Sequence, residues 1–383
     1  MPAELTLAET VATIHRMYDP AHADTWDAVG LVTGDPASPV RRVLFAVDPV
    51  QAVIDEAVAW AADLLLVHHP LLLKPVHSVA ATTPKGRAVH SLIREGIALL
   101  VAHTNADAPA AGVSDAMAQA FGLVDPRPVD PAPAPPMDKL VVFVPHDDAA
   151  RLGEALADAG AGQVGDYDRC AFSSTVIGSF RPGPGARPTV GVVGRLEQVP
   201  ETRLEMVLSR DRRDTVLQAL MSSHPYEEPA YDLLEMADLP GESGHGRVGR
   251  LAAPSTLGDF CESVVSCLPA THSVVRVAGD LDRRVQTVAL CGGSGDFLLD
   301  AVRDAGADVY VTSDLRHHPA SELAEHAAAP ALIDVPHWAA ESLWLPVVQS
   351  LLHSELGARG TTVETKVSRI VTDPWTSHLP MPS

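Results

Sequence analysis

The chain has 383 residues, 46% of them hydrophobic, which is too long for one ordinary core and predicts two or three folded domains. Its 49 Asp and Glu residues outnumber 28 Lys and Arg residues, and the net charge of −21 opposes binding to nucleic acids and to anionic membranes. The first residues lack the basic flank and apolar run of a signal peptide, and no apolar run approaches membrane-spanning length, so we predict a cytoplasmic protein.

The first third of the chain alternates short apolar runs with helical patterns. The apolar runs occupy 43–48, 63–69 and 97–103. This alternation predicts an α/β layer with buried strands in residues 1–125. The proline-rich segment 126–137 follows, and it predicts a stiff, extended linker because proline blocks helix propagation and has no amide donor.

The sequence pattern changes in residues 138–246 and then changes back. The order of strand and helix patterns in this part is typical of a small α+β module. Strands are expected at 139–145, 189–196 and 203–209, and helices near 149–160 and 213–223. From 247 to 383 the α/β alternation returns, with strands at 287–293, 308–313 and 331–335. The outer segments are therefore predicted to form a two-part α/β core that is interrupted by an insertion.

Histidines are the main candidates for metal ligands or catalytic residues in this chain. The chain has 17 histidines, several of them clustered, whereas its four cysteines are scattered, which favours imidazole and carboxylate ligands over thiolates or disulfides. His68 and His69 end one apolar run and precede Pro70, which favours an extended backbone and places both rings at the carboxyl edge of a sheet. Taken alone, the pair is better explained as two hydrogen-bonded surface histidines.

The run at 97–103 ends in a similar way. It finishes at His103 and continues to Asn105 and Asp107, which places polar groups at the same kind of edge. Asp107 has two oxygens that can bridge two cations, or else Asn105 and Asp107 shape a turn through hydrogen bonds to the backbone. We prefer the turn role for Asn105. His103 is interpreted as a residue that supports metal ligands rather than a ligand itself.

A third strand, 331–335, leads into a helix that begins near His337. His337 and Glu341 are four residues apart and therefore share one helix face. Alone, this spacing is more often an exposed pair worth little. The three strand ends together, however, deliver His68, His69, Asp107, His337 and Glu341 to one sheet edge. This set predicts a dinuclear site for two divalent transition-metal ions, and it suits zinc, iron or manganese better than calcium or magnesium.

Two further motifs follow strands in the last third. CGGSG at 291–295 is either a ligand-binding turn or an empty tight turn, and it matches neither the Walker nor the dinucleotide-binding pattern. Asp314, His317 and His318 follow the strand at 308–313. Either histidine is a candidate proton donor or acceptor lining a cleft, and His318 and Glu341 are the two candidates for catalytic residues.

At this point the residues resemble a known family over nearly the whole length, the GTP cyclohydrolase 1 type 2 homologues or dinuclear metal centre hexameric proteins. The motifs that carry the resemblance are DTWDAVGLVTGDP (24–36), VHHPLLLKP (67–75), HTNADAPAAGVSDAMA (103–118), GGSG (292–295) and DVPHWAAESLWLP (334–346). The middle section, with SHPYEEPAYDLL at 223–234, is similar to the ferredoxin-like insertion of longer members, related to PII and copper-tolerance modules. Ala106, Pro336 and His317 depart from the usual pattern, and the last of these departures affects the expected substrate contacts.

The resemblance implies that the five residues above match the family's metal-ligand positions and that the chain forms a toroidal homohexamer. The family name implies ring opening of GTP with release of formate, although the same constellation would serve hydrolysis of another nucleotide or small molecule. Two functions therefore stay open at this stage. One is a metal-dependent hydrolase, and the other is a non-catalytic metal-binding or regulatory hexamer whose insertion senses a ligand.

Overall fold

The fold is mixed α/β, as the sequence predicts, and it is seen in a computed structural model that describes residues 5–379. The chain divides into two compact units. The first unit is Met1–Ala132 together with Glu242–Ser383, and the second is Pro133–Gly241. The second unit lies close to the insertion expected at 138–246.

A mostly parallel five-stranded sheet forms one half of the first unit, in the order β1-β4-β3-β2-β17. Its strands are β1 (Gly30–Thr33), β2 (Arg42–Ala46), β3 (Leu64–Val67), β4 (Ala98–Val101) and β17 (Glu364–Val367). Its helices are α1 (Leu7–Met17), η1 (Pro20–His22), α2 (Gln51–Ala59), α3 (Pro84–Arg94) and α12 (Leu345–Ala358). Alternate residues of β3 face opposite sides: Leu64 and Leu66 pack with α1 and α12, and Leu65 and Val67 pack with α2 and α3.

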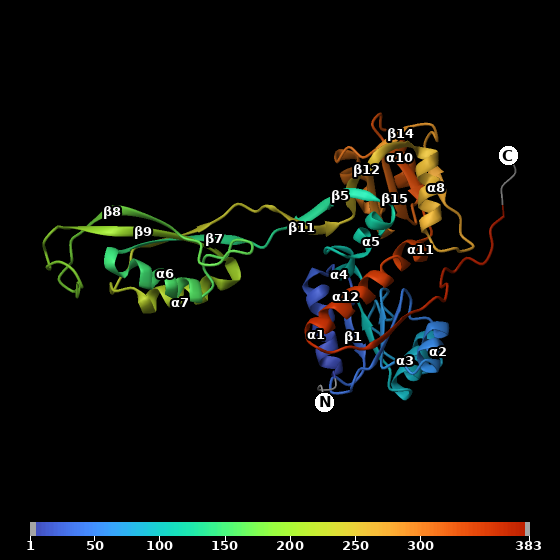
Figure 1. Cartoon of the computed structure of the whole chain (residues 1–383), viewed down its shortest axis with the longest axis horizontal. Helices are drawn as coiled ribbons and strands as arrows, with labels where there is room; N and C mark the ends of the chain where they lie inside the picture. Colours follow the sequence, from blue (N-terminus) through green and yellow to red (C-terminus); the bar gives the residue numbers. More distant parts are fainter. Residues whose placement is uncertain (1–4, 380–383) are drawn as a thin grey trace. The chain divides into compact units, whose positions relative to one another are not determined.

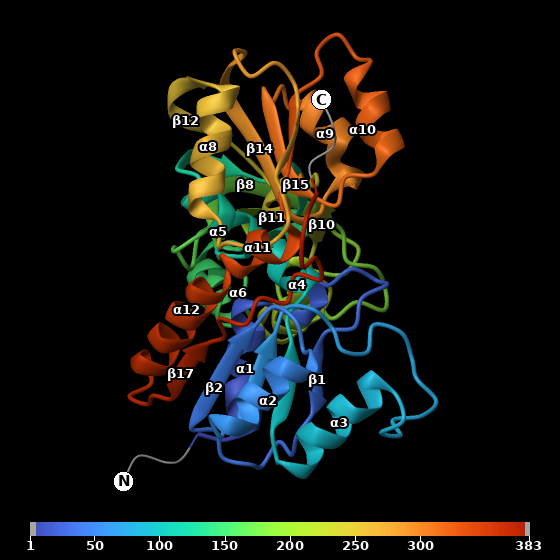
Figure 2. The same ribbon diagram turned by 90° about the vertical axis from the view of Figure 1, so that its right-hand side faces the viewer.

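A six-stranded sheet forms the other half of the first unit, in the order β13-β16-β15-β14-β12-β5. Its strands are β5 (Leu123–Arg127), β12 (Arg247–Thr256), β13 (Arg276–Ala278), β14 (Arg284–Ser294), β15 (Val309–Ser313) and β16 (Ala331–Asp334). Its helices are α4 (Thr104–Asp107), α5 (Val113–Ala120), α8 (Leu257–Cys267), η4 (Asp296–Leu298), α9 (Leu299–Asp304), α10 (His317–Ala324) and α11 (His337–Ser342). Figures 1 and 2 show α4, α5 and α11 between the two sheets of this unit.

The second unit contains a four-stranded antiparallel sheet in the order β10-β7-β9-β8. Its elements are β7 (Met137–Pro145), η2 (His146–Asp148), α6 (Ala149–Asp158), β8 (Phe172–Phe180), β9 (Glu197–Ser209), η3 (Arg210–Arg212), α7 (Arg213–Ser223) and β10 (Tyr231–Glu235). Leu204, Met206 and Leu208 of β9 face the two helices and form the core with them. The intervening residues of β9 therefore face the opposite side of the sheet.

The structure differs from the sequence prediction in two segments. Residues 189–196, predicted as a strand, form an irregular loop, because Gly191 and Gly194 have φ angles of 91° and 84° that an extended strand does not allow. The edge strand beside β9 is β8, which lies earlier in the chain. The proline-rich segment 126–137 is extended, but part of it is paired: β6 (Asp130–Pro133) lies beside β11 (Pro240–His245) in a two-stranded ribbon.

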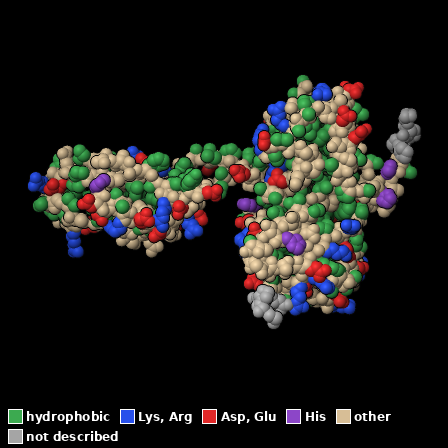
Figure 3. Space-filling view, in the orientation of Figure 1, with side chains coloured by type: hydrophobic (Ala, Val, Ile, Leu, Met, Phe, Trp, Pro, Cys, Tyr) green, Lys and Arg blue, Asp and Glu red, His purple; other side chains and the backbone are tan. Residues whose placement is uncertain are grey.

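No helix within residues 5–379 has the length and apolar character needed to cross a membrane. On the face seen in Figure 3, Lys and Arg side chains are interspersed with Asp and Glu side chains and do not gather into a basic patch. Charges of both signs are therefore mixed on that face.

Candidate metal centre

Histidine and carboxylate side chains from three chain segments converge in the first unit. His68 and His69 directly follow β3, Asp107 ends α4, and His337 and Glu341 lie one turn apart on α11. Parallel strands β3 and β4 end at the same edge of one sheet, and α11 follows β16 of the other sheet. The connections after three strands therefore bring together all five residues that the sequence proposes as ligands.

Glu341 lies at the middle of this cluster. Its Oε1 is 2.8 Å from His337 Nε2 and 3.5 Å from His68 Nε2. Its Oε2 is 2.9 Å from His69 Nε2. The Glu341 side chain is only 3% exposed, so its negative charge is held away from solvent and is balanced by the surrounding histidines.

The remaining distances place the other donors around the same space. Nε2 of His69 and Nε2 of His337 are 3.3 Å apart, and Asp107 Oδ1 is 3.6 Å from His68 Nε2. Among residues 5–379, His69, His337 and Glu341 form one group whose donor atoms all lie within 4.8 Å of one another. The geometry is that of a nitrogen and oxygen donor set, which suits borderline transition metals.

Each clustered histidine is held from behind through its Nδ1 atom. His69 Nδ1 is 2.7 Å from Asp48 Oδ1, and His337 Nδ1 is 2.7 Å from Asp314 Oδ2. His68 Nδ1 is 2.9 Å from the backbone oxygen of Ala102. A proton on Nδ1 donates to each of these oxygens and leaves the Nε2 lone pair facing the cluster, which is the arrangement found behind metal-bound histidines.

His103 lies closer to the cluster than its predicted supporting role requires. Its Nδ1 is 2.9 Å from Asp27 Oδ1, and His68, His69 and His103 form a second group with donor atoms within 4.8 Å. The alignment of β3 with β4 explains this, because Val67 pairs with Val101 and the chain continues to His69 and His103. Asn105 has the expected turn role, since its side chain accepts from the His103 amide and donates to Tyr18.

Three buried atoms test whether a cation fits this cluster. His68 Nε2 and Asp107 Oδ1 have no hydrogen-bond partner within the described part of the chain, and Glu341 Oε2 has only its 2.9 Å contact with His69 Nε2. Buried polar atoms nearly always have a partner, and leaving one without a partner costs about 1–3 kcal/mol. All three belong to residues proposed as ligands, so a bound cation would satisfy them together. The residues present therefore fit a metal site.

The pKa values in the cluster show which charges balance Glu341 when no metal is bound. Burial opposes charge on every member, yet Glu341 raises the pKa of His69 to about 11 and that of His337 to about 10, with help from Asp48 and Asp314. Burial likewise opposes ionisation of Glu341, but His69, His337 and His68 outweigh it and hold the Glu341 pKa well below its usual value. Burial raises the pKa of Asp107 to about 6. Without metal, protons on the histidines balance Glu341.

We therefore expect metal binding to release protons and to weaken as the pH falls. At pH 8 the rings of metal-free His69 and His337 are both protonated on both nitrogens and positively charged, because their pKa values lie near 11 and 10. A metal needs the neutral rings, so roughly two protons should leave per chain. Calorimetric titration of zinc into chelator-treated protein, in buffers of different ionisation enthalpy, measures this number. Release of no protons at pH 8 would contradict the charge assignment.

The glycine-rich motif at 291–295 contributes clearance to the cluster. Gly293 has φ of 66°, and a Cβ on it would lie 2.8 Å from Glu341 Oε1, so only glycine lets β14 approach this carboxylate. The sequence pattern suggested either an anion-binding turn or an empty tight turn, and it gave no sign of this role. The sequence prediction also missed Asp48, although the apolar run 43–48 ends in that residue at the same edge as His69.

His317 and His318 do not join the cluster. Both are exposed at the start of α10, where their rings contact each other at 5.2 Å between centroids. The cavity beside the cluster has a volume of ≈ 570 Å³. Residues from both halves of the first unit line it, including His69, His337, Asp314, Trp338 and Trp375. Its size is suitable for a small-molecule ligand.

Comparison with known proteins shows matches along nearly the whole chain. The Duf34/NIF3 (NGG1p interacting factor 3) family matches residues 5–374. A Mycobacterium tuberculosis protein named "GTP cyclohydrolase 1 type 2 homolog" is 46% identical over 370 residues, 96% of this chain and 96% of its own. A Bacillus subtilis protein of the same name is 40% identical over 302 residues, 79% of this chain and 80% of its own.

Solved structures also match the chain. A Bacillus cereus protein related to NIF3 has a TM-score of 0.78 and 35% identity, covering 97% of this chain and 98% of its own. A Staphylococcus aureus protein has a TM-score of 0.84 and 26% identity, covering 99% of this chain and 100% of its own. The two matches show that the arrangement of elements described above recurs in solved structures.

Proposed function

This chain belongs to the Duf34/NIF3 family of GTP cyclohydrolase 1 type 2 homologues, and from its cluster we propose that it is a metal-dependent hydrolase acting on a nucleotide or related small molecule. The observation that carries the proposal is the convergence of five donor residues beside a cavity of ≈ 570 Å³, where the buried atoms His68 Nε2 and Asp107 Oδ1 lack hydrogen-bond partners. The five residues are His68, His69, Asp107, His337 and Glu341. GTP ring opening is the particular reaction that the relatives' name suggests.

In this proposal the five residues would hold two divalent ions, zinc, iron or manganese, and the Glu341 carboxylate would balance part of their charge. Such ions supply Lewis acidity that activates water and polarises a substrate. Asp48 and Asp314 keep His69 and His337 oriented through their Nδ1 atoms. Of the two candidate catalytic residues, Glu341 is in the cluster, and His318 receives no role because it is exposed and its ring contacts His317.

The proposal also includes the homohexamer and the ferredoxin-like, PII-like insertion that the family resemblance implies. The order β7-α6-β8-β9-α7-β10 in the second unit supports the second of these, because a ferredoxin-like module has the same β-α-β-β-α-β order. Every proposed metal ligand lies outside Pro133–Gly241.

The proposal is tested by metal content and turnover together. Protein stripped with a chelator and reloaded with zinc, iron(II) or manganese should hold about two ions per chain by elemental analysis. The loaded protein should hydrolyse at least one member of a nucleotide panel that includes GTP, with formate assayed for ring opening. His337→Ala and metal-free protein are the controls. One ion or fewer overturns the dinuclear site, and two ions without turnover overturn the hydrolase.

A further inference from the structure

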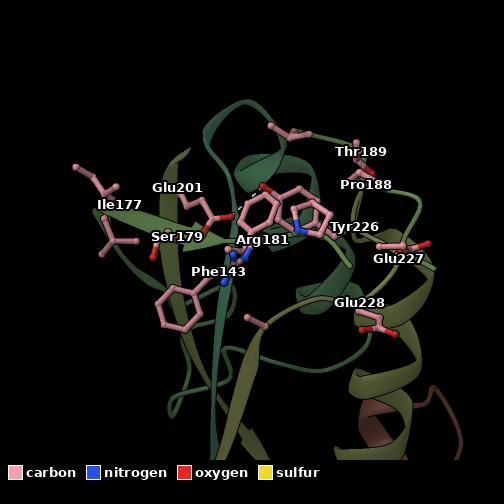
Figure 4. Close-up of a pocket in the computed structure, with 17 residues that line it drawn as sticks. Phe143, Ile177, Ser179, Arg181, Pro188, Thr189, Glu201, Tyr226, Glu227 and Glu228 are labelled. Atoms are coloured by element: carbon pink, nitrogen blue, oxygen red, sulfur yellow. Dashed lines mark hydrogen bonds between the residues drawn. The ribbon is translucent and has the colours of Figure 1, made fainter. Parts of the chain in front are cut away.

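A second cavity lies within the second unit, apart from the metal-ligand residues. Its volume is ≈ 410 Å³, within the range of small-molecule sites. Its floor is the face of β8 and β9 that points away from α6 and α7, and its other walls are the loop 181–196 and the segment 225–230. The walls are mainly apolar, with Phe143, Ile177 and Phe180 among them. Figure 4 shows Phe143, Pro188 and Tyr226 among the side chains around the open space.

One buried carboxylate faces this cavity. Glu201 is 6% exposed, and its Oε1 accepts a hydrogen bond of 2.9 Å from the Tyr226 hydroxyl, as Figure 4 shows. Its Oε2 lies over Gly178, where a Cβ would be 2.3 Å away. Glycine inside a strand often marks a close approach by another group, and here it makes room for the carboxylate.

The Glu201 charge has no cationic partner among residues 5–379. Arg203 lies on the same face of β9 but pairs with Glu205 at 3.1 Å, and Arg181 lines the cavity without forming an ion pair to Glu201. His224 is neutral, because its Nε2 donates to the Phe143 oxygen while its Nδ1 accepts from the Tyr226 amide. A buried carboxylate without a counter-ion is costly, so the cavity favours a ligand that brings positive charge.

The remaining charges and rings narrow the class of ligand. Glu227 and Glu228 also line the cavity, against Arg181 alone, and this excess of carboxylates opposes phosphate-bearing ligands such as nucleotides. A bare metal ion is also disfavoured, because both donor groups able to hold one among the described residues lie in the first unit. The rings of Phe180 and Tyr226, 6.3 Å apart between centroids, suit an organic cation, which aromatic faces attract.

We propose that this cavity binds an organic cation, an ammonium or guanidinium group carried on an apolar body, with Glu201 as its counter-ion. The Tyr226 hydroxyl fixes the orientation of the carboxylate. The apolar body of the ligand contacts Phe143, Phe180 and the loop 181–196. The site is independent of the metal centre. It gives the second unit a binding function of its own.

The proposal is tested by calorimetry on the full-length, chelator-treated protein, so that no amine binds through metal. The probes are phenethylamine, benzylguanidine and phenyltrimethylammonium, with 2-phenylethanol as the neutral match and 3-phenylpropionate as the anionic match. At least one of the three cations should bind, whereas neither 2-phenylethanol nor 3-phenylpropionate should bind. Glu201→Gln keeps the shape but removes the charge, so it should weaken binding by at least about tenfold. Glu154 is an exposed carboxylate on α6, and Glu154→Gln should leave the affinity for the cation unchanged.

A second variant keeps the test decisive if Glu201→Gln fails to fold by circular dichroism. Ala186→Trp lies on the loop, outside the sheet, and should fill the cavity and abolish binding of the same cation. The proposal is overturned if none of the three cations binds, if 3-phenylpropionate binds more tightly than they do, or if a folded Glu201→Gln or Ala186→Trp binds the cation as tightly as the parent.

Discussion

Replacing Glu341 by Gln should weaken the binding of at least one of the two proposed ions by on the order of 100-fold, the upper end of what losing even an outer support costs a metal site. The carboxylate contacts His337 and His68 through Oε1 and His69 through Oε2, so it is the one negative charge shared by all three rings. Glutamine preserves the volume but removes that charge, and two cations would then repel each other with less compensation. Competition with a chromophoric chelator measures the change.

The control for this variant is the same Glu-to-Gln substitution at a residue that does not contact the metal-ligand cluster. Glu355 is exposed on α12, and Glu355→Gln should leave metal affinity unchanged, as should His77→Ala on an exposed segment. Folding should be retained in Glu341→Gln, because its contacts are to the cluster and not to an apolar core. Full metal affinity in this variant would show that Glu341 does not hold an ion and that its pairing with His337 is structural. Unchanged metal content with lost turnover would assign Glu341 to proton transfer.

The sequence predicted where the donors converge because that part depends on local patterns. A buried strand that ends in a polar residue places it at the carboxyl edge of a parallel sheet, and β3 and β4 do so with His68, His69 and His103. The helix spacing of His337 and Glu341 was equally visible. These two rules account for four of the five candidates, and Asp107 follows His103 in the connection after β4.

Other features around the histidines could not be predicted in the same way. Asp48 ends the apolar run 43–48 and could have been found by the same rule, but Asp27 reaches His103 from a loop whose path depends on the packing of the whole unit. The clearance at Gly293 is a property of two elements from different parts of the chain. In the second unit, apolar residues at 189–196 suggested a strand, but glycines with positive φ override such a pattern. Long-range contacts and backbone conformation decide these features, and neither has a short sequence signal.

Arg247 is another such feature, and its loss should destabilise the first unit severely. Arg247 is only 2% exposed. Its guanidinium donates to both oxygens of Asp115, at 2.6 and 3.2 Å. It also donates to the backbone oxygens of Ala108, Pro109, Gly244 and Gly246. Arg247→Met fills much of the space but leaves the partly buried Asp115 carboxylate and four carbonyls without this donor, so we expect a loss of about 3–5 kcal/mol in the free energy of unfolding.

The distribution of tryptophan allows this loss to be measured in one unit alone. All five tryptophans of the chain, Trp26, Trp60, Trp338, Trp344 and Trp375, lie outside Pro133–Gly241, so their fluorescence during urea unfolding reports the first unit. Arg250→Met is the matched control, because Arg250 is exposed three residues further along β12, and it should change the free energy by no more than about 0.5 kcal/mol. Because Arg247 also holds the two carbonyls that follow Asp107, Arg247→Met should weaken metal binding under conditions where it remains folded. Equal unfolding midpoints for Arg247→Met and Arg250→Met would show that the buried guanidinium does not hold this part of the fold together.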